Sequence, residues 1–211
     1  MISTKENDQL YVFLYQCTHT CQSSMVIITY IFSKRLAKGI FFTYFCKEKP
    51  TKKHMKFTLL VVGRTVEKHY ITAIDDYVAR TKHFTQFDME VIPELKNTKS
   101  LSMEQQKEKE AELILKALQP GDVVVLLDEH GKEFRSIEFA DWIERKMHTV
   151  NKRLVFIIGG PYGFSPKVYA AAQEKISLSK MTFSHQMIRL IFVEQLYRAF
   201  TILNNNPYHH E

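Results

Sequence analysis

The sequence predicts an α/β fold in which helices cover both faces of a mostly parallel sheet. From Lys56 onward, short apolar segments typical of strands alternate with longer segments of helical periodicity. The segment Phe57–Val62 is continuously apolar, as expected for a strand that is buried on both faces. The chain has 211 residues, 45% of them hydrophobic, which is enough for one large core. We therefore expect one main domain.

The first half of this domain is predicted to contain three strands and two helices. The expected strands are Phe57–Val62, Phe87–Ile92 and Val123–Leu127, and the expected helices are Val66–Phe84 and a charged segment from Ser102 to Leu118. Pro93–Leu101 is expected to be a polar loop. Gln119-Pro120-Gly121 ends the second helix, because proline and glycine do not continue a helix well.

The second half continues the alternation of helices and strands. Ser136 is expected to cap a helix that extends to about Val150, and Leu154–Ile158 is expected to form the next strand. Ser165 places a capping hydroxyl before Pro166, which favours a helix start just past a glycine loop. A short strand over Ile176–Leu178 and a loop to Ser184 follow.

The last predicted helix, from about His185 to Leu203, is apolar on almost every side. Such a helix must be buried on more than one side. One covering surface is the sheet of the same chain, and the other is expected to be the same helix of a second subunit. The pattern therefore predicts a homodimer with two-fold symmetry.

Residues 1–54 differ from the rest of the chain. They contain eight Lys and Arg against three Asp and Glu, a net charge of +5, whereas residues 55–211 contain 21 against 20, a net charge of +1. They contain no apolar run of the roughly 18 to 20 residues that a membrane span needs, and no secretory signal. We interpret them as an unstructured extension upstream of a natural start at Met55. The alternatives are a basic arm that touches RNA or membrane, and a membrane anchor within residues 10–46.

The cysteines indicate a reducing compartment. Cys17, Cys21 and Cys46 all precede Met55, so the main domain has no disulfide framework, and we expect a cytoplasmic protein without a membrane span. Cys17 and Cys21 flank His19, but no second ligand pair follows at zinc-finger spacing, so we expect no metal. The sequence pI of 9.1 suggests an acidic partner, and a local basic patch near the C-terminus could supply the contact. It comprises Lys175, Lys180, His185, Arg189, Arg198, His209 and His210, against the single acid Glu194.

Two loops near the C-terminus indicate a ligand site. Gly159-Gly160-Pro161-Tyr162-Gly163 follows a strand and precedes a helix, which lets a ligand approach bare backbone. Its spacing and its late position disfavour a dinucleotide fold, and no P-loop lysine follows. A second loop, Leu178–Gln186, can offer amides and carbonyls to the polar edge of a base. Together they predict an adenosine site, with a plain structural turn as the alternative.

Two further groups of polar residues are candidates for chemistry. Asp128, Glu129 and His130 follow a predicted strand and could act as acid and base or bind a metal, although adjacent carboxylates in a loop are more often solvated. His185 and Arg189 lie one helical turn apart. Either His185 caps the helix and Arg189 pairs with Glu194 or a carbonyl, or the two hold a phosphate and a target base.

From Met55 to its end the sequence resembles the ribosomal large-subunit methyltransferase H family, the 23S rRNA (pseudouridine-1915, N3) methyltransferases of the SPOUT class. The resembling motifs are Lys56–Gly63, Gly159-Gly160-x-x-Gly163, Leu178–Phe183, His185-Gln186-Met187-Ile188-Arg189, Glu194-Gln195-x-Tyr197-Arg198-Ala199 and Pro207-Tyr208-His209. The resemblance implies a C-terminal trefoil knot, a homodimer, S-adenosyl-L-methionine as cofactor, and methylation of 23S rRNA on the assembled ribosome. The alternative is a non-catalytic ribosome-associated RNA-binding protein of the same fold.

The resemblance also implies site residues. The cofactor contacts would be Leu127, Gly159, Leu178, Ser179, Lys180, Met181, Thr182 and Phe183. Leu127 and Met181 would enclose the adenine, whereas Lys180 is expected to face RNA or solvent. The substrate-positioning residues would be His185, Arg189, Tyr208 and His209. His210 stands where relatives usually have Arg or Lys, which weakens the expectation of a phosphate contact there.

Overall fold

The structure is a computed structural model that describes residues 11–12, 30–31, 55–95 and 100–208. The chain divides into two compact units, Met1–Lys52 and Lys53–Glu211. In the first unit the described residues form two short antiparallel strands, β1 (Tyr11–Val12) and β2 (Tyr30–Ile31). The candidate ligands Cys17, His19 and Cys21 lie outside the described residues. No helix of the described part has the length and apolar character needed to cross a membrane.

The second unit is built on a five-stranded parallel sheet with the order β4-β3-β6-β5-β7. The strands are β3 (Lys56–Val62), β4 (Gln86–Ile92), β5 (Asp122–Glu133), β6 (Arg153–Ile158) and β7 (Glu174–Ser177). The central strand β6 and its neighbour β3 are buried almost throughout. Their continuous apolar sequences follow from this position, since a strand at the centre of a covered sheet meets no solvent on either face.

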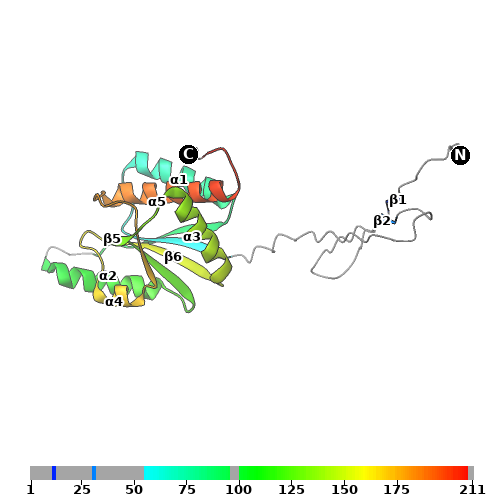
Figure 1. Ribbon diagram of the computed structural model, residues 1–211. Helices are drawn as coiled ribbons and strands as arrows, with labels where there is room; N and C mark the ends of the chain where they lie inside the picture. Colours follow the sequence, from blue (N-terminus) through cyan, green and yellow to red (C-terminus); the bar gives the residue numbers. More distant parts are fainter. Residues whose placement is uncertain (1–10, 13–29, 32–54, 96–99, 209–211) are drawn as a thin grey trace, which may run out of the picture. The chain divides into compact units, whose positions relative to one another are not determined.

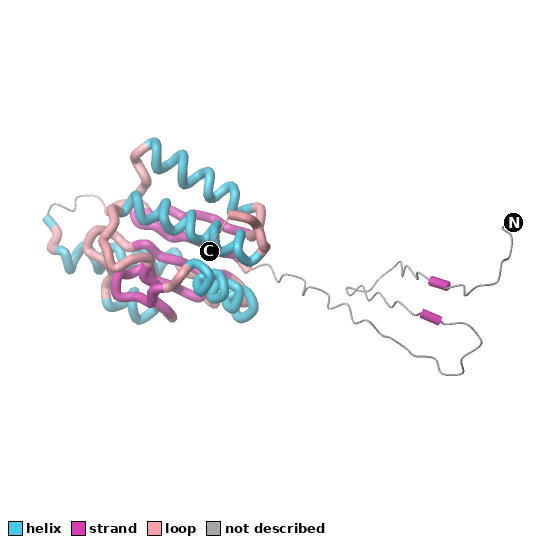
Figure 2. Tube along the Cα trace, turned by 45° about the horizontal axis from the view of Figure 1, so that its top comes forward, coloured by secondary structure: helices cyan, strands magenta, loops and turns pink. Residues whose placement is uncertain are grey.

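Helices cover both faces of the sheet (Figure 1). On one face lie α1 (Lys68–Lys82), α3 (Ser136–Thr149) and α5 (His185–Leu203), and α5 contacts both of the others. The other face is covered by α2 (Met103–Ala117) and the short α4 (Pro166–Ala171), which contact each other. Figure 2 shows the strands between the two helical layers. The predicted α/β class is therefore confirmed.

Each face of the sheet has its own apolar core. On the side of α5, Phe156 packs against Phe192 with ring centroids 4.7 Å apart, and Phe57 meets Phe200 edge-on at 5.3 Å. On the side of α2, the core comprises Leu60, Ile114, Ile157, Val168 and their neighbours. The glycine loop leaves the sheet between these two cores, at the end of β6.

Helix α5 is covered by its own chain, and not by a second subunit as its apolar sequence suggested. Its flanks contact α1 and α3, and its inner side packs on the sheet. The apolar pattern alone therefore does not require a second subunit. The homodimer and the trefoil knot both stay predictions.

The sequence placed the end of β5 incorrectly. The strand continues beyond Leu127 to Glu133, so Asp128 and Glu129 do not lie in a simple loop before a helix. Leu127 and Lys132 both pair with Ile176 of β7, and residues 128–131 form an excursion between them. A Cβ at Gly131 would lie 2.5 Å from the carbonyl carbon of Ile176, so this close return requires glycine.

The start of α3 is a second correction. Ser136 is the first helical residue rather than the cap, and Arg135 occupies the N-cap position. The Arg135 N–H donates to Oε2 of Glu138, 2.9 Å away. The carboxylate of Glu138 thus accepts a hydrogen bond from the N-cap backbone. In most helices with this contact the N-cap residue is a serine or threonine, whereas here it is Arg135.

Candidate functional site

A cavity of about 670 Å³ opens at the carboxyl ends of β5 and β6. The glycine loop that follows β6 and the loop that follows β7 form most of its wall. Its lining includes Leu127, Gly159, Gly160, Tyr162, Leu178, Ser179, Met181, Thr182, Phe183 and His185. This is the edge at which parallel α/β sheets bind their ligands, because the connecting loops there enclose a crevice.

The glycine loop is tightly packed on its inner side. A Cβ at Gly159 would lie 3.0 Å from the ring of Phe164, and a Cβ at Gly160 would overlap Oε2 of Glu110. Gly163 has a φ of +78°, and its N–H donates to the Gly160 carbonyl at 3.1 Å, which closes the turn. A side chain at Gly159 or Gly160 would therefore require Phe164 or Glu110 to move, and Gly163 has the left-handed backbone conformation that favours glycine.

The second loop is held by its own serines. The Ser177 hydroxyl donates to the Ser179 carbonyl at 3.0 Å, and the Met181 N–H donates to the Ser179 hydroxyl at 2.9 Å. These contacts fix the loop as it passes the cavity. Seven of the eight predicted cofactor residues line the cavity. The eighth, Lys180, does not: its side chain is 86% exposed and lies 3.9 Å from Glu133, in agreement with the expected solvent-facing orientation.

Asp128 lies at the rim of the cavity and is not solvated as the sequence suggested. Its side chain is only 9% exposed and accepts hydrogen bonds from the Tyr169 hydroxyl at 2.5 Å and the His130 N–H at 2.8 Å. Partial burial acts to raise the pKa of Asp128, but these hydrogen bonds outweigh it and hold the pKa below its usual value. Burial and the bond to Asp128 raise the pKa of Tyr169 to about 12. Asp128 therefore orients Tyr169.

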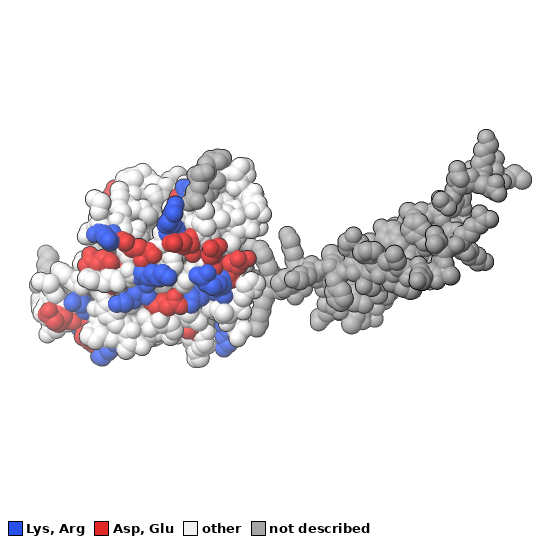
Figure 3. Space-filling view, in the orientation of Figure 1, with Lys and Arg blue, Asp and Glu red and all other residues white. Residues whose placement is uncertain are grey.

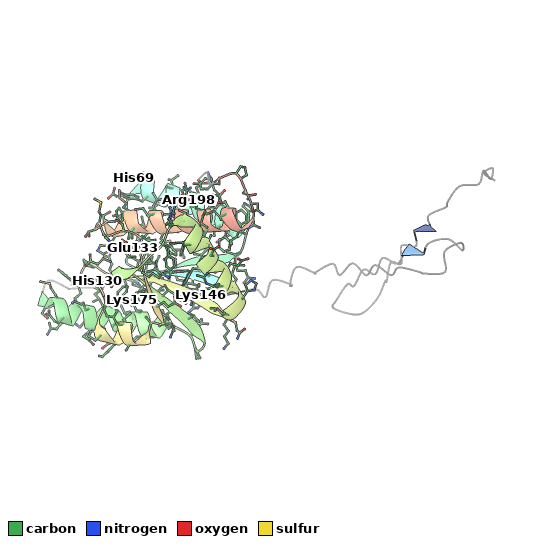
Figure 4. All side chains as sticks on the ribbon, in the orientation of Figure 1. His69, His130, Glu133, Lys146, Lys175 and Arg198 are labelled. Carbon is green, nitrogen blue, oxygen red and sulfur yellow. The ribbon has the colours of Figure 1, made fainter. Side chains whose placement is uncertain are left out.

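The acid and histidine side chains at this rim do not assemble a metal site. Among residues 55–95 and 100–208, no three His, Cys, Asp or Glu side chains come together in a way that could hold an ion. Figure 4 labels His130, Glu133 and Lys175 on the face of the molecule turned to the viewer.

His185 lines the cavity from the first turn of α5. The N-cap of this helix is Ser184, whose hydroxyl accepts from the Met187 N–H at 3.3 Å, so His185 is not the cap. Partial desolvation and the nearby Arg189 lower the pKa of His185, while Glu110 and a hydrogen bond with the Gly159 backbone act in the opposite direction. The imidazole is therefore neutral at pH 7 and faces the cavity as a proton acceptor.

Arg189 does not face the cavity. It is only 2% exposed, and its guanidinium donates to the Val62 carbonyl at 2.6 Å and to the Thr65 hydroxyl at 3.0 Å. Arg189 was expected either to pair with Glu194 or a carbonyl, or to hold a phosphate. The structure contains a contact with a carbonyl. A buried guanidinium cannot reach a phosphate in this conformation, so Arg189 instead joins α5 to the end of β3.

Tyr208 is not part of the cavity wall. Its hydroxyl donates to Glu194 at 3.1 Å and hydrogen-bonds the Tyr77 hydroxyl at 3.2 Å, while Arg198 lies 4.9 Å from its ring centroid. Burial and these neighbours raise the pKa of Tyr208. Tyr208 is therefore held against α1 and α5. His209 and His210 lie outside the described residues.

Two charged residues of α2 near the cavity were not predicted from the sequence. Lys107 lines it, and Glu110 is buried against Gly160 behind the loop. Both lie in a helix rich in Lys and Glu, where charges are usually solvated. The position of Glu110 in the helix could have indicated its burial. It precedes Ala111 and lies four residues before Ile114, on the side of α2 that faces the sheet.

The surface around the site carries mixed charge. Figure 3 shows Lys and Arg side chains interleaved with Asp and Glu over the face that carries β5, β7 and α3. Figure 4 labels Lys146, Lys175 and Arg198 on the same face. Lys146 is paired with Glu174, and Arg198 lies 2.5 Å from Glu194. This face is therefore not a uniformly basic surface.

Comparison with known proteins adds three findings. A family model described as a predicted SPOUT methyltransferase matches residues 55–209. The chain is 91% identical over 157 residues to the ribosomal RNA large subunit methyltransferase H of Phocaeicola vulgatus, which corresponds to 74% of this chain and 100% of that protein. Proteins of the same name from Bacteroides thetaiotaomicron and Flavobacterium johnsoniae are 83% and 55% identical, with the same coverage.

Proposed function

This chain belongs to the ribosomal RNA large subunit methyltransferase H family of SPOUT methyltransferases, and from this membership we propose that it methylates N3 of a pseudouridine in 23S rRNA. The methyl donor would be S-adenosylmethionine. The observation that carries the proposal is the cavity, because seven of the eight residues expected to contact the donor line it.

The donor fits the residues present. A volume of about 670 Å³ lies within the usual range of small-molecule sites. Leu127 and Met181 offer apolar surface to the adenine, and the amides and carbonyls of Leu178–Phe183 offer polar partners to its edge. Gly159 lines the cavity and offers bare backbone to the donor, because the space of a side chain there is filled by Phe164. When bound, S-adenosylmethionine would supply an electrophilic methyl group, and its sulfur would keep the electron pair as a neutral thioether.

The chain itself contributes alignment and a proton acceptor. In-line displacement is accelerated chiefly by holding the two reactants at near-attack distance, which is the task of the two fixed loops. N3 of the target base must also lose its proton. His185 is neutral at pH 7 and faces the cavity, so it is suited to accept this proton or to orient the base. Arg189 supports this arrangement from behind, through the end of β3.

The assembled ribosome is the substrate we favour, in the cytoplasm. Residues 55–211 have a net charge of only +1. The face shown in Figure 3 carries mixed charge, not the uniformly positive charge that binds free RNA. A nearly neutral enzyme has little non-specific affinity for nucleic acid. Recognition is then expected to depend on the shape of an assembled surface. The alternative of a non-catalytic RNA-binding protein loses support, because both loops and their glycines are present.

Methyl transfer from labelled S-adenosylmethionine tests the proposal. The full chain, and residues 55–211 alone, would be offered ribosomes that lack the modification, and the product nucleoside would be identified by mass spectrometry. We expect a methylated pseudouridine with both proteins and much less product with free rRNA fragments. Incorporation at another nucleoside would refute the substrate assignment, and absence of donor binding in calorimetry would refute the methyltransferase activity itself. Equal methylation of free fragments would refute the requirement for the ribosome.

A further inference from the structure

We propose that Glu110 favours the charged methyl donor over the neutral product, by placing a buried negative charge behind the glycine loop. This inference rests on the proposed function, because it concerns the affinity of the same cavity for S-adenosylmethionine and S-adenosylhomocysteine. It assigns a specificity role to a residue of α2 that does not itself line the cavity.

The position of Glu110 is set by close packing. Its side chain is 4% exposed, and Oε1 accepts a hydrogen bond from the Gln106 amide at 2.9 Å. A Cβ at Gly160 would overlap its Oε2 and come within 2.8 Å of Oε1. The carboxylate therefore lies directly against Gly160, whose other side lines the cavity. Only one residue of backbone separates the charge from the ligand space.

The surroundings of Glu110 provide little compensation for its charge. Its hydrogen-bond partner, Gln106, is neutral, and its charge also acts on the titratable side chain of His185. Among the described residues, no Lys or Arg forms an ion pair with it. The buried Arg153 shows the usual arrangement: it lies 2.6 Å from Asp122 and 3.2 Å from Glu90. A buried carboxylate without a cation is costly. A cationic ligand on the far side of the loop would offset that cost.

The ligand chemistry matches this charge. The donor carries a sulfonium cation that the thioether product lacks, while the adenosine and the amino-acid part are common to both. Contacts with the adenine therefore cannot separate donor from product, whereas a fixed negative charge can. As a general estimate, a fixed charge about 10 Å from an opposite ligand charge, at an effective dielectric constant near 20, changes a binding constant by roughly tenfold. A difference of this size lets product leave without weakening donor binding.

Other charges facing the cavity do not supply the same effect. Asp128 is also a negative charge at the rim, but Lys175 and the hydrogen bonds from Tyr169 and the His130 N–H act on it there. The side chain of Glu129 is largely exposed. Lys107 is positive and lines the cavity, so it opposes a cationic ligand. His185 is neutral at pH 7. Glu110 is thus the buried negative charge behind the loop.

Calorimetry with the full chain at pH 7.5 tests the inference. The dissociation constants of S-adenosylmethionine and S-adenosylhomocysteine would be measured for wild type, Glu110→Gln and Glu108→Gln. Glu108 is a matched control, because it lies on the same helix and pairs with the exposed Lys167 at 2.5 Å. We expect Glu110→Gln to weaken donor binding roughly tenfold while product binding changes little. We expect Glu108→Gln to leave both constants unchanged.

The possible outcomes separate a charge effect from a structural one. If Glu110→Gln weakens both ligands equally, Glu110 only holds the loop, and the inference is wrong. If neither constant changes, it is also wrong. If wild type binds neither ligand, the proposed function fails instead, whatever the variant does. Should Glu110→Gln not fold, Lys107→Met decides: a selective gain in donor affinity supports discrimination by charge, and an unchanged ratio of the two constants overturns it.

Discussion

His185 and Arg189 lie one turn apart on α5, yet their surroundings give them different roles. His185 reaches the cavity, whereas Arg189 is buried and satisfies the Val62 carbonyl. Spacing along a helix predicts that two residues share a face, but it does not predict how deeply each one is buried. The chemistry of the site therefore depends on His185 and on the loops, and Arg189 serves the framework.

The ionisation of His185 gives a prediction for pH dependence. Its pKa is lowered in the folded protein, so the neutral form persists below the ordinary histidine value of about 6.5. We expect the methyl-transfer rate to stay constant as pH falls to about 6.5 and to decline only below it.

The free energy of unfolding should fall in the same pH range. The folded state resists protonation of His185, so the contribution of this group to stability is present above about pH 6.5 and is lost as pH falls further. NMR titration of His185, with His185→Gln to assign the signal, checks this. A midpoint above 6.5 would contradict it.

Gly159 provides a test of the cavity wall. A side chain here would press on Phe164 from 3.0 Å on the inner side of the loop and so displace the backbone that lines the cavity. We expect Gly159→Val to abolish donor binding in calorimetry, a loss of at least about tenfold, while circular dichroism shows a folded protein. Retained affinity would mean that the donor does not bind against this loop.

At the scale of elements, the contacts of Arg189 join α5 to the end of β3. Removing the guanidinium leaves the buried Val62 carbonyl without its partner, which typically costs about 1–3 kcal/mol. Urea denaturation of Arg189→Met should show a loss of this size. Arg198→Met, on the same helix, is the comparison: it loses a partly exposed ion pair with Glu194 but no contact with a backbone carbonyl, so we expect a smaller loss. Equal losses for the two variants would show that the carbonyl contact is not the cause.

Most elements follow from the sequence because a covered parallel sheet produces continuous apolar strands. The extension of β5 past Leu127 did not follow, because residues 128–133 are polar and charged. Their pairing comes from β7, which is about 45 residues away in sequence. Local periodicity does not contain information of this kind, and tertiary context overrides it.

The candidate site was predictable where backbone conformation matters and not where burial of charge matters. Glycines and small polar residues mark loops that approach a ligand, so the two walls of the cavity were found. Glu110 and Tyr169 were missed, because each is a common residue in a helix and gains its role from a neighbour on another element. The family resemblance identified the loop residues but not Glu110 or Tyr169.

At the scale of the whole molecule, the homodimer is a prediction that sedimentation can test. Val66 is 69% exposed, and its N–H donates to Gln186 Oε1 at 3.1 Å, which places it beside the exposed Met187 at the start of α5. We expect the full chain to sediment as a dimer at micromolar concentration and Val66→Asp to shift it toward monomer. Val91→Asp, at a site 44% exposed on β4, is the control and should remain dimeric. A monomeric wild type would contradict the dimer.

The extension before Met55 gives a second prediction at this scale. The family model matches from residue 55, and the residues before it carry most of the net charge. We predict that protein isolated from the native source begins at Met55. Peptide masses after digestion check this, since a peptide that spans Lys53 to Lys56 would contradict it.

The excursion of β5 has a consequence for how this family of sites can diversify. Leu127 and Lys132, at the two ends of the excursion, both pair with Ile176 of β7. Residues 128–131 therefore do not change the position of β5 along β7. Insertions or deletions between these ends would leave the sheet in register on both sides. Apart from Gly131, which the close return requires, the rim of the cavity can therefore change in length and composition while the sheet stays constant. This makes the segment suitable for loop exchange in engineering.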